Sequence, residues 1–264
     1  MVEAAAAYLA IGAAVGFFAG LLGIGGGTII VSSLALMFAA QGFPAAYVMH
    51  CAIGTSLAAI IAGAWGSFRA HDRHGAVDWA TVKAMIPGLL GGVAVGALLA
   101  RFLPAAFLKY FFLGFMALIV FQLVFNLRPK ATRALPGRSG LAAMAVVIGL
   151  CSSWFGGGAA AVGVPFLTWC NMNTHRAIGT VAALGFPVAI AGAAAYAISG
   201  LNVAGLPPWS AGFVYLPAFL GISITSLAFA PIGVRLAHRL KGPTLRRIFA
   251  VFLLAVGAKV AISV

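Results

Sequence analysis

Long stretches of this chain carry no charged side chain. No Asp, Glu, Lys or Arg occurs between Glu3 and Arg69, between Arg138 and Arg176, or between Arg176 and Arg235. A helix needs only about 20 consecutive apolar residues to cross a bilayer. Charged residues make up 7% of the 264 residues, against about 25% in soluble globular proteins. The chain is therefore predicted to be an all-α polytopic membrane protein.

The same composition excludes several other classes of protein. Soluble enzymes, disordered tails and disulfide-stapled secreted domains do not have this balance of apolar and charged residues. The net charge of +13 is typical of nucleic-acid binding only when the positive residues form one patch. The N-terminus lacks the basic region of a cleavable signal peptide, so the first apolar stretch is predicted to stay in the membrane.

Glycine, proline and polar residues divide the chain into ten apolar segments. They are Tyr8–Leu22, Thr28–Ala40, Ala46–Phe68, Val82–Leu103, Ala106–Leu127, Leu141–Phe155, Ala159–Cys170, Ala177–Ser199, Ser210–Val234 and Leu245–Val264. The first two, and the sixth and seventh, are too short to span about 30 Å of hydrocarbon comfortably. A glycine cluster joins each short pair, Gly25–Gly27 and Gly156–Gly158. Two broken or re-entrant helix pairs with tips inside the membrane are predicted.

The two halves of the chain resemble each other. After the glycine cluster, His50–Thr55 matches His175–Thr180 at five of six positions, and Pro87–Gly91 corresponds to Pro217–Gly221. Ordered matches of this kind indicate an internal duplication. Because each half has five segments, an odd number, the second half enters the membrane from the opposite side. The fold is predicted to be two inverted-topology repeats, residues 1–130 and 140–264, joined by a basic linker at 131–139.

The positions of the positive charges predict the orientation, because cytoplasmic loops of membrane proteins are rich in Lys and Arg. With the N-terminus outside, thirteen of the sixteen positive residues fall in cytoplasmic loops. These are Arg69, Arg73, Lys83, Arg128, Lys130, Arg133, Arg138, Arg176, Arg235, Arg239, Lys241, Arg246 and Arg247. Only Arg101, Lys109 and Lys259 fall outside. Both termini are therefore predicted to be periplasmic, and the positive charge requires no nucleic-acid partner.

The recurring glycine clusters are candidate ligand sites, although close helix packing is the alternative. Helices beginning near Thr28 and Ala159 would direct free N–H groups and the positive ends of their dipoles at an anion. Hydroxyl groups nearby can add hydrogen bonds, but each can instead bond its own helix. The candidate substrate-binding residues are Gly25, Gly26, Gly27, Thr28, Thr55, Ser56, Ser153, Gly156, Gly157, Gly158 and Thr180.

His50 and His175 also recur in the duplication. They are candidates for a pH-sensitive gate or a hydrogen-bond donor at each mouth, His50 outside and His175 inside. The alternative is a polar residue at a helix entrance near the membrane surface.

Several chemistries lack the residues that they need. No Asp or Glu lies inside any predicted span, although proton relays and cation sites usually use such acids. No triad acid, metal-ligand spacing or P-loop is found. The three cysteines have no CxxC spacing. The chain is therefore predicted not to be an enzyme, and to need no cofactor and no metal.

Four stretches resemble one known family. Gly16–Gly27, Ala52–Ser56 and Gly149–Leu167, followed by the ending Gly233–Phe249, look like the sulfite exporter TauE/SafE family, also called the toluene sulfonate uptake permeases. The resemblance covers essentially the whole chain. It implies a carrier of sulfur-containing anions, such as sulfite, sulfoacetate or other organosulfonates, in the bacterial inner membrane. Ser152–Phe155 departs from the family's usual spacing, so the two hairpins are not expected to contribute equally.

The leading hypothesis is a secondary transporter that exports such anions by alternating access around a midplane site. An anion channel, or an accessory subunit of a membrane complex, is the alternative. The expected partners are a small anionic substrate and the lipid bilayer. The sequence leaves the oligomeric state open, a homodimer included.

Overall fold

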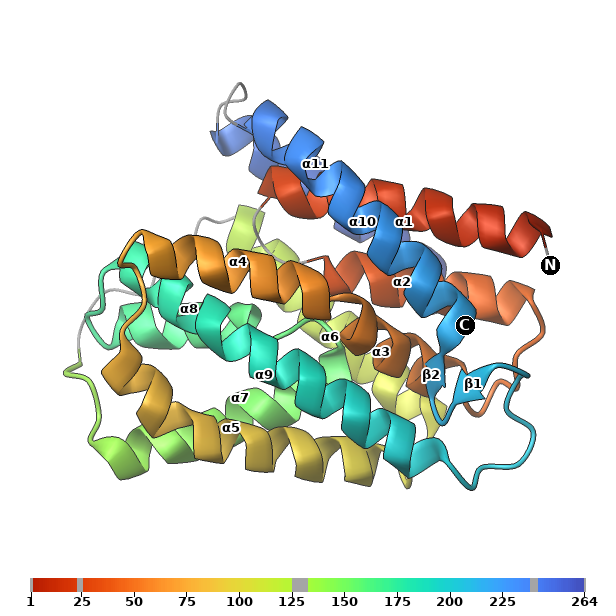
Figure 1. The fold of residues 1–264 in the computed structure, drawn as a ribbon, viewed down its shortest axis with the longest axis horizontal. Helices are drawn as coiled ribbons and strands as arrows, with labels where there is room; N and C mark the ends of the chain where they lie inside the picture. The colour runs from red at the N-terminus through yellow and green to blue at the C-terminus, as the bar shows by residue number, and fades with distance from the viewer. Residues whose placement is uncertain (1, 23–25, 125–132, 238–241, 264) are drawn as a thin grey trace.

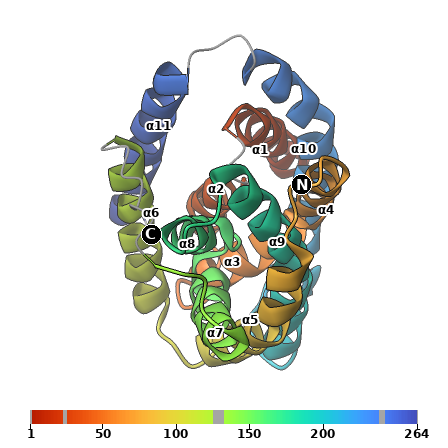
Figure 2. The same cartoon turned by 90° about the vertical axis from the view of Figure 1, so that its left-hand side faces the viewer.

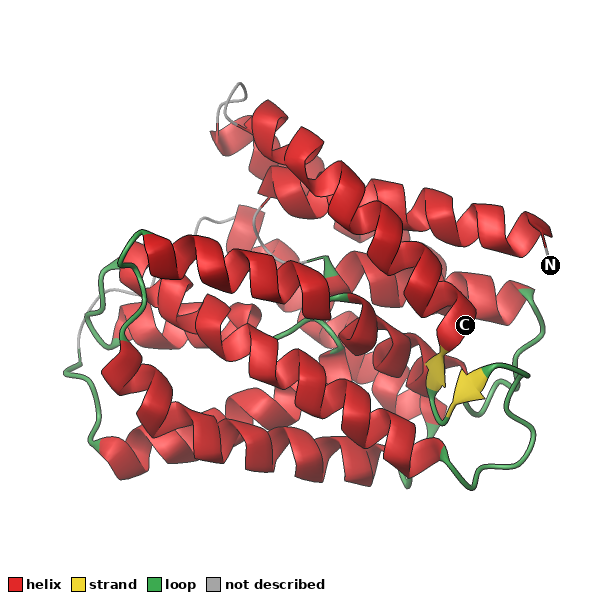
Figure 3. Ribbon diagram, in the orientation of Figure 1, coloured by secondary structure: helices red, strands yellow, loops and turns green. Residues whose placement is uncertain are grey.

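The computed structural model describes residues 2–22, 26–124, 133–237 and 242–263. These residues form eleven helices and one small hairpin (Figures 1 and 3). The helices are α1 (Val2–Leu22), α2 (Gly27–Ala40), α3 (Val48–Ala59), α4 (Ile61–Arg73), α5 (Trp79–Ala100), α6 (Ala105–Val124), α7 (Arg138–Phe155), α8 (Ala160–Trp169), α9 (Thr174–Gly200), α10 (Leu216–Ala237) and α11 (Gly242–Ser263). The strands β1 (Ser210–Ala211) and β2 (Val214–Tyr215) lie between α9 and α10. Each predicted apolar segment corresponds to one helix, except that the third is divided.

Four described helices, α5, α6, α7 and α9, are long and apolar enough to cross a membrane, and the bent pair α3–α4 makes a fifth candidate. Apolar side chains cover the outside of the bundle. Val95, Leu98 and Leu99 of α5 are 45–50% exposed, and Val251 and Leu254 of α11 are more than half exposed. Exposure on this scale fits lipid contact and not water. The prediction of an all-α polytopic membrane fold is confirmed.

The third predicted segment is broken at Ile60, where α3 ends, α4 begins and the axis bends by 40°. The sequence shows no proline there. The β-branched side chains of Ile60 and Ile61 stand at the break, and Gly63 follows. Each of these residues favours a helix less than alanine does, so tertiary packing is enough to decide the bend.

Two helical hairpins enter the bundle from opposite ends. In Figure 1, α1 starts at the right-hand end and α2 returns there, whereas α7 starts at the left-hand end and α8 returns there. The start of α2 at Gly26–Thr28 is buried, as are Gly156 and Ala159 before α8. Viewed from the left-hand end, α8 lies inside the outline formed by α6, α7, α9 and α10 (Figure 2). Non-helical backbone at membrane depth is tolerated only where protein covers it, and the described turn between α7 and α8 is enclosed in this way.

The two sequence halves interlock. α1 packs chiefly against α10, and α7 packs chiefly against α5. Gly12 and Gly16 of α1 lie against the backbone of α10, while Gly88 and Gly92 of α5 lie against the backbone of α7. Small residues four positions apart let membrane helices approach this closely. Each half therefore supplies the packing partner of a hairpin helix in the other half.

The structure corrects one predicted segment boundary. Ser210–Val234 was expected to be helical from its start, but Ser210 pairs with Tyr215 and Ala211 with Val214 in an antiparallel hairpin. Gly212 has a φ of +56°, which is the left-handed region that glycine favours. Helix α10 starts only at Leu216, directly after the second strand.

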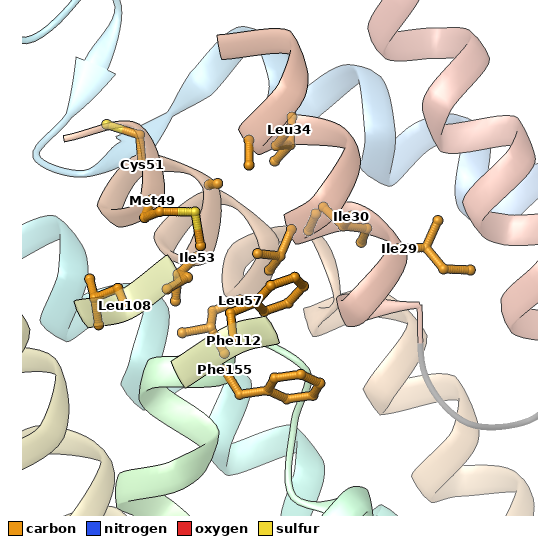
Figure 4. Packing of buried hydrophobic residues seen from close by; sticks show 14 of the residues in the cluster. Ile29, Ile30, Leu34, Met49, Cys51, Ile53, Leu57, Leu108, Phe112 and Phe155 are labelled. Atoms are coloured by element: carbon orange, nitrogen blue, oxygen red, sulfur yellow. The ribbon is translucent and has the colours of Figure 1, made fainter. Parts of the chain in front are cut away.

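Aromatic packing fixes the end of α7. The ring of Phe155 lies 5.4 Å from that of Phe112 and 4.8 Å from that of Phe115, measured between centroids. Figure 4 shows Phe155 and Phe112 beside Leu57 of α3 and below Ile30 of α2. A second buried cluster joins α5, α7, α8 and α9. Because Phe155 is the last residue of α7, its packing holds the second glycine cluster in place.

Candidate functional site

The second hairpin turns on glycines with unusual backbone geometry. Gly156 follows the last residue of α7 as its C-cap, with a φ of +68°, and Gly158 has a φ of +80°. Both angles are left-handed, and L-residues with a Cβ adopt them rarely. A Cβ on Gly157 would overlap the ring of Phe155. The glycines are therefore needed for the turn itself, after which α8 begins at Ala160 with its first N–H groups free of intrahelical partners.

The first hairpin presents a similar helix start. Gly26 caps α2, whose first residues are Gly27 and Thr28, and all three are buried. The first N–H groups of α2, like those of α8, have no acceptor within their own helix. Gly25, also a predicted site residue, lies outside the described residues.

The two tips meet. A Cβ on Gly27 would lie 2.6 Å from Gly156 O and 2.6 Å from Gly157 Cα, so the backbones of the two hairpins are in direct contact. Ser56 Oγ lies 3.0 Å from Gly156 O and 3.2 Å from Gly27 O. Its single hydrogen can be donated to either carbonyl. One closed junction thus brings together four predicted site residues: Gly27, Ser56, Gly156 and Gly157.

Three of the other predicted hydroxyls have backbone partners. Thr55 Oγ1 accepts a hydrogen bond from the Tyr215 N–H at 2.9 Å, and Thr180 Oγ1 accepts one from the Asp78 N–H at 3.0 Å. Ser153 Oγ donates to Leu150 O at 2.7 Å within its own helix.

Thr28 lies at the junction mainly through its backbone. It is buried, and its carbonyl accepts a hydrogen bond from Ser32 Oγ at 2.7 Å. Gly158 follows the junction and is half-buried.

The two recurring histidines lie at opposite ends of the molecule. His50 is buried, with Nε2 2.8 Å from Ala100 O and its ring 5.1 Å from that of Phe213. Its Nδ1 has no hydrogen-bond partner among the described residues. His175 is exposed and interacts electrostatically with His71 at the other end. The two histidine side chains are therefore in different environments, although the sequences that follow them match.

Two neighbours of the junction were not among the predicted site residues. Tyr196 is fully buried in α9, and its hydroxyl donates to Ser153 O at 3.0 Å. Trp154 donates from Nε1 to Gly96 O at 2.8 Å and packs edge-on against Phe107. A tyrosine in the middle of an apolar run is a signal for a buried hydrogen bond, and Tyr196 could have been identified in this way.

The residues that the structure describes include no group of three His, Cys, Asp or Glu side chains able to hold a metal ion. Cys51, Cys151 and Cys170 are unpaired.

Replacing Ser56 by alanine is expected to destabilise the protein more than the same change at Ser32. Both side chains are fully buried, but Ser32 Oγ bonds only its own helix, at Thr28 O. Ser56→Ala leaves carbonyls of two hairpins without their shared donor, at a cost of about 1–3 kcal/mol. Thermal unfolding in detergent measures the difference. Equal shifts of Tm for the two variants would show that the Ser56 hydroxyl between the two hairpins adds no stability of its own.

Comparison with known proteins gives consistent matches. The family model described as sulfite exporter TauE/SafE matches residues 8–260. A "Probable membrane transporter protein" of Haemophilus influenzae is 32% identical over 250 residues, covering 94% of each chain. The "Probable membrane transporter protein YdhB" of Bacillus subtilis is 26% identical over 197 residues, which are 70% of this chain and 76% of that one. No solved structure matches the chain.

The family match extends over both hairpins and over the helices that enclose them. Together with the apolar spans and the full-length similarity to the Haemophilus influenzae protein, it shows that the chain belongs to the sulfite exporter TauE/SafE family of membrane transporters.

Proposed function

We propose that this transporter exports small sulfur-containing anions, such as sulfite, sulfoacetate or another organosulfonate, across the bacterial inner membrane. The anion binds between the tips of the α1–α2 and α7–α8 hairpins, and alternating access opens this place to one side at a time. One observation carries the proposal: the two tips, each followed by the start of a helix, meet inside the bundle at Gly27 and Gly156.

The electrostatics of this place favour an anion. The starts of α2 and α8 direct N–H groups and positive dipole ends toward it. Glycine lets a ligand approach the backbone closely, and Ser56 adds a hydroxyl. The three acidic residues of the chain, Glu3, Asp72 and Asp78, all lie near helix ends, away from the tips. A site with no fixed cation binds its anion weakly enough to release it.

The closed junction favours a carrier over a permanently open channel. Backbone contact at Gly27 leaves no room there for even one methyl group, so an anion can enter only if the tips separate. The buried hydroxyls of Thr55 and Thr180 bind backbone N–H groups and support the walls of the site through α3 and α9.

The charge distribution supports an orientation with the left-hand end of Figure 1 in the cytoplasm. Most described positive residues lie toward that end, namely Arg69, Arg73, Lys83, Arg133, Arg138, Arg176 and Arg235. At the other end, Lys109 Nζ donates to Ala261 O near the end of α11. Both termini are then periplasmic. Moving one charge through 100 mV is worth about 2.3 kcal/mol, or about fifty-fold in concentration, so a monoanion leaves the negative interior without a coupled ion.

Flux measurements test the proposal directly. Proteoliposomes loaded with labelled sulfite or sulfoacetate are expected to release it when an inside-negative potential is imposed. Release should saturate with concentration, as for a carrier. Liposomes carrying Gly27→Val protein serve as the control. No potential-driven release of any sulfur oxyanion would contradict the proposed substrate class, and unitary currents in a planar bilayer would favour a channel.

A further inference from the structure

The Ala-Ile-Gly-Thr motif of the first half holds the segment that leads into α10. Gly54 lies so close to this segment that a Cβ would be 2.8 Å from Phe213 O. The next residue, Thr55, accepts a hydrogen bond from the Tyr215 N–H at 2.9 Å. The helix α10 begins one residue later, at Leu216. Through Gly54 and Thr55, helix α3 thus holds the segment just before α10, a helix from the other half of the chain. We call this pair of contacts a clamp.

The same motif in the second half makes the same contact with the segment that leads into α5. A Cβ on Gly179 would lie 2.5 Å from Ala76 O, and Thr180 accepts a hydrogen bond from the Asp78 N–H at 3.0 Å. The helix α5 begins one residue later, at Trp79. In both clamps the glycine meets the carbonyl two residues before the N–H that the threonine binds.

The two clamps lie at opposite ends of the molecule. The segment before α10 is at the right-hand end of Figure 1 with the β1–β2 hairpin, and the segment before α5 is at the left-hand end after α4. Both threonines are fully buried. Each clamp joins one half of the chain to the other, so relative movement of the halves must strain or break at least one of them.

We infer that the two clamps are a matched pair of latches that open in turn during transport. This inference rests on the proposed alternating access. The clamp of Thr55 closes the outer, periplasmic end, and the clamp of Thr180 closes the inner, cytoplasmic end. With both closed, the tips are sealed from both sides. Opening the outer latch exposes the tips to the periplasm, and opening the inner latch exposes them to the cytoplasm.

The two latches differ in their surroundings. Phe213 of the outer latch packs against the rings of His50, Tyr47 and Tyr196, with centroids 5.1, 5.8 and 6.4 Å away. The inner latch has Ala76 at the equivalent position, whose N–H donates to His71 O at 3.0 Å. Aromatic contacts add to the outer latch an attraction that the inner one lacks. Loss of the threonine hydrogen bond should therefore open the inner latch further than the outer one.

The test measures which side of the membrane can reach the tips. A reporter cysteine, Ala160→Cys at the start of α8, is placed in a protein whose three native cysteines are replaced by alanine. A membrane-impermeant maleimide is then applied to intact cells or to inverted vesicles. Thr180→Val is expected to raise labelling from inside about fivefold, because one lost hydrogen bond is worth about 1 kcal/mol. Thr55→Val is expected to raise labelling from outside by less, because the aromatic contacts of Phe213 remain.

Controls separate a latch from a general structural role. Thr168→Val removes a hydroxyl that bonds only its own helix and should leave labelling unchanged. Thr55→Ser and Thr180→Ser keep the hydroxyl and should restore the original pattern. The inference is overturned if Thr55→Val and Thr180→Val raise labelling from the same side of the membrane, or if neither variant changes it. Labelling does not depend on the substrate, so this result is independent of whether sulfite is transported.

Discussion

A valine in place of Gly27 is expected to abolish anion transport while the protein stays folded in the membrane. The new Cβ would lie 2.6 Å from two backbone atoms of the other hairpin, Gly156 O and Gly157 Cα, and neither can rotate away. Overpacking of this kind costs about 1–3 kcal/mol, which is small for a large bundle. The tips must then stand apart in every state, and the helix starts no longer converge on one anion. We expect the initial rate of sulfite efflux to fall at least about tenfold, a difference of about 1.4 kcal/mol.

The matched control is Gly63→Val. Gly63 is also a helical glycine, on the exposed side of α4, and nothing lies within 4 Å of an added Cβ there. This variant should transport at the original rate. Size-exclusion chromatography in detergent confirms that both proteins are folded. Normal efflux through the Gly27→Val protein would remove the tips from the transport pathway.

Leucine in place of Gly92 is expected to give the largest loss of stability. Gly92 lies in the contact between α5 and α7, where a Cβ would overlap Val146 O and approach Val146 Cα to 2.9 Å. Because a backbone cannot be repacked as a side chain can, the two helices must separate along their length. A cost of about 2–3 kcal/mol corresponds to a fall in Tm of about 5–10 °C for a chain of this size.

Gly91→Leu is the control for this change because it adds the same side chain one position earlier. Gly91 is exposed, and nothing lies within 4 Å of an added Cβ. Thermal unfolding of the two purified variants in the same detergent measures the difference. Equal losses of stability would mean that helix propensity, and not the close α5–α7 contact, explains the effect.

Most of the fold could be predicted because the membrane imposes a simple rule on the sequence. Apolar length locates the helices, and Gly25–Gly27 and Gly156–Gly158 locate the two reversals. The bend at Ile60 and the β1–β2 hairpin could not be predicted in this way. Both occur in apolar sequence without a proline at the break, where contacts with other helices decide between nearly equal backbone conformations.

The contacts of the candidate site residues were predictable only in part. The glycines and Ser56 could be proposed because they are small or polar residues in apolar surroundings. The roles of Thr55 and Thr180 could not be assigned, since their partners lie 160 and 102 residues away in the sequence. The sequence alone does not distinguish a hydroxyl that binds an anion from one that binds a backbone N–H or its own helix. Only the tertiary fold selects among these partners.

The interlocked halves also set an order of assembly. Helix α1 leaves the ribosome before α2–α9, yet the helix that covers Gly12 and Gly16 is α10, which follows all of these in the sequence. Helix α7, by contrast, emerges when its partner α5 is already in the membrane. Domains of long chains generally fold in the order of their synthesis, but here the α1–α2 hairpin must wait until α10 has been synthesised. Docking of α10 onto α1 therefore follows the synthesis of α2–α9, and a nascent chain that stops before Leu216 leaves the α1–α2 hairpin without the helix that packs against it.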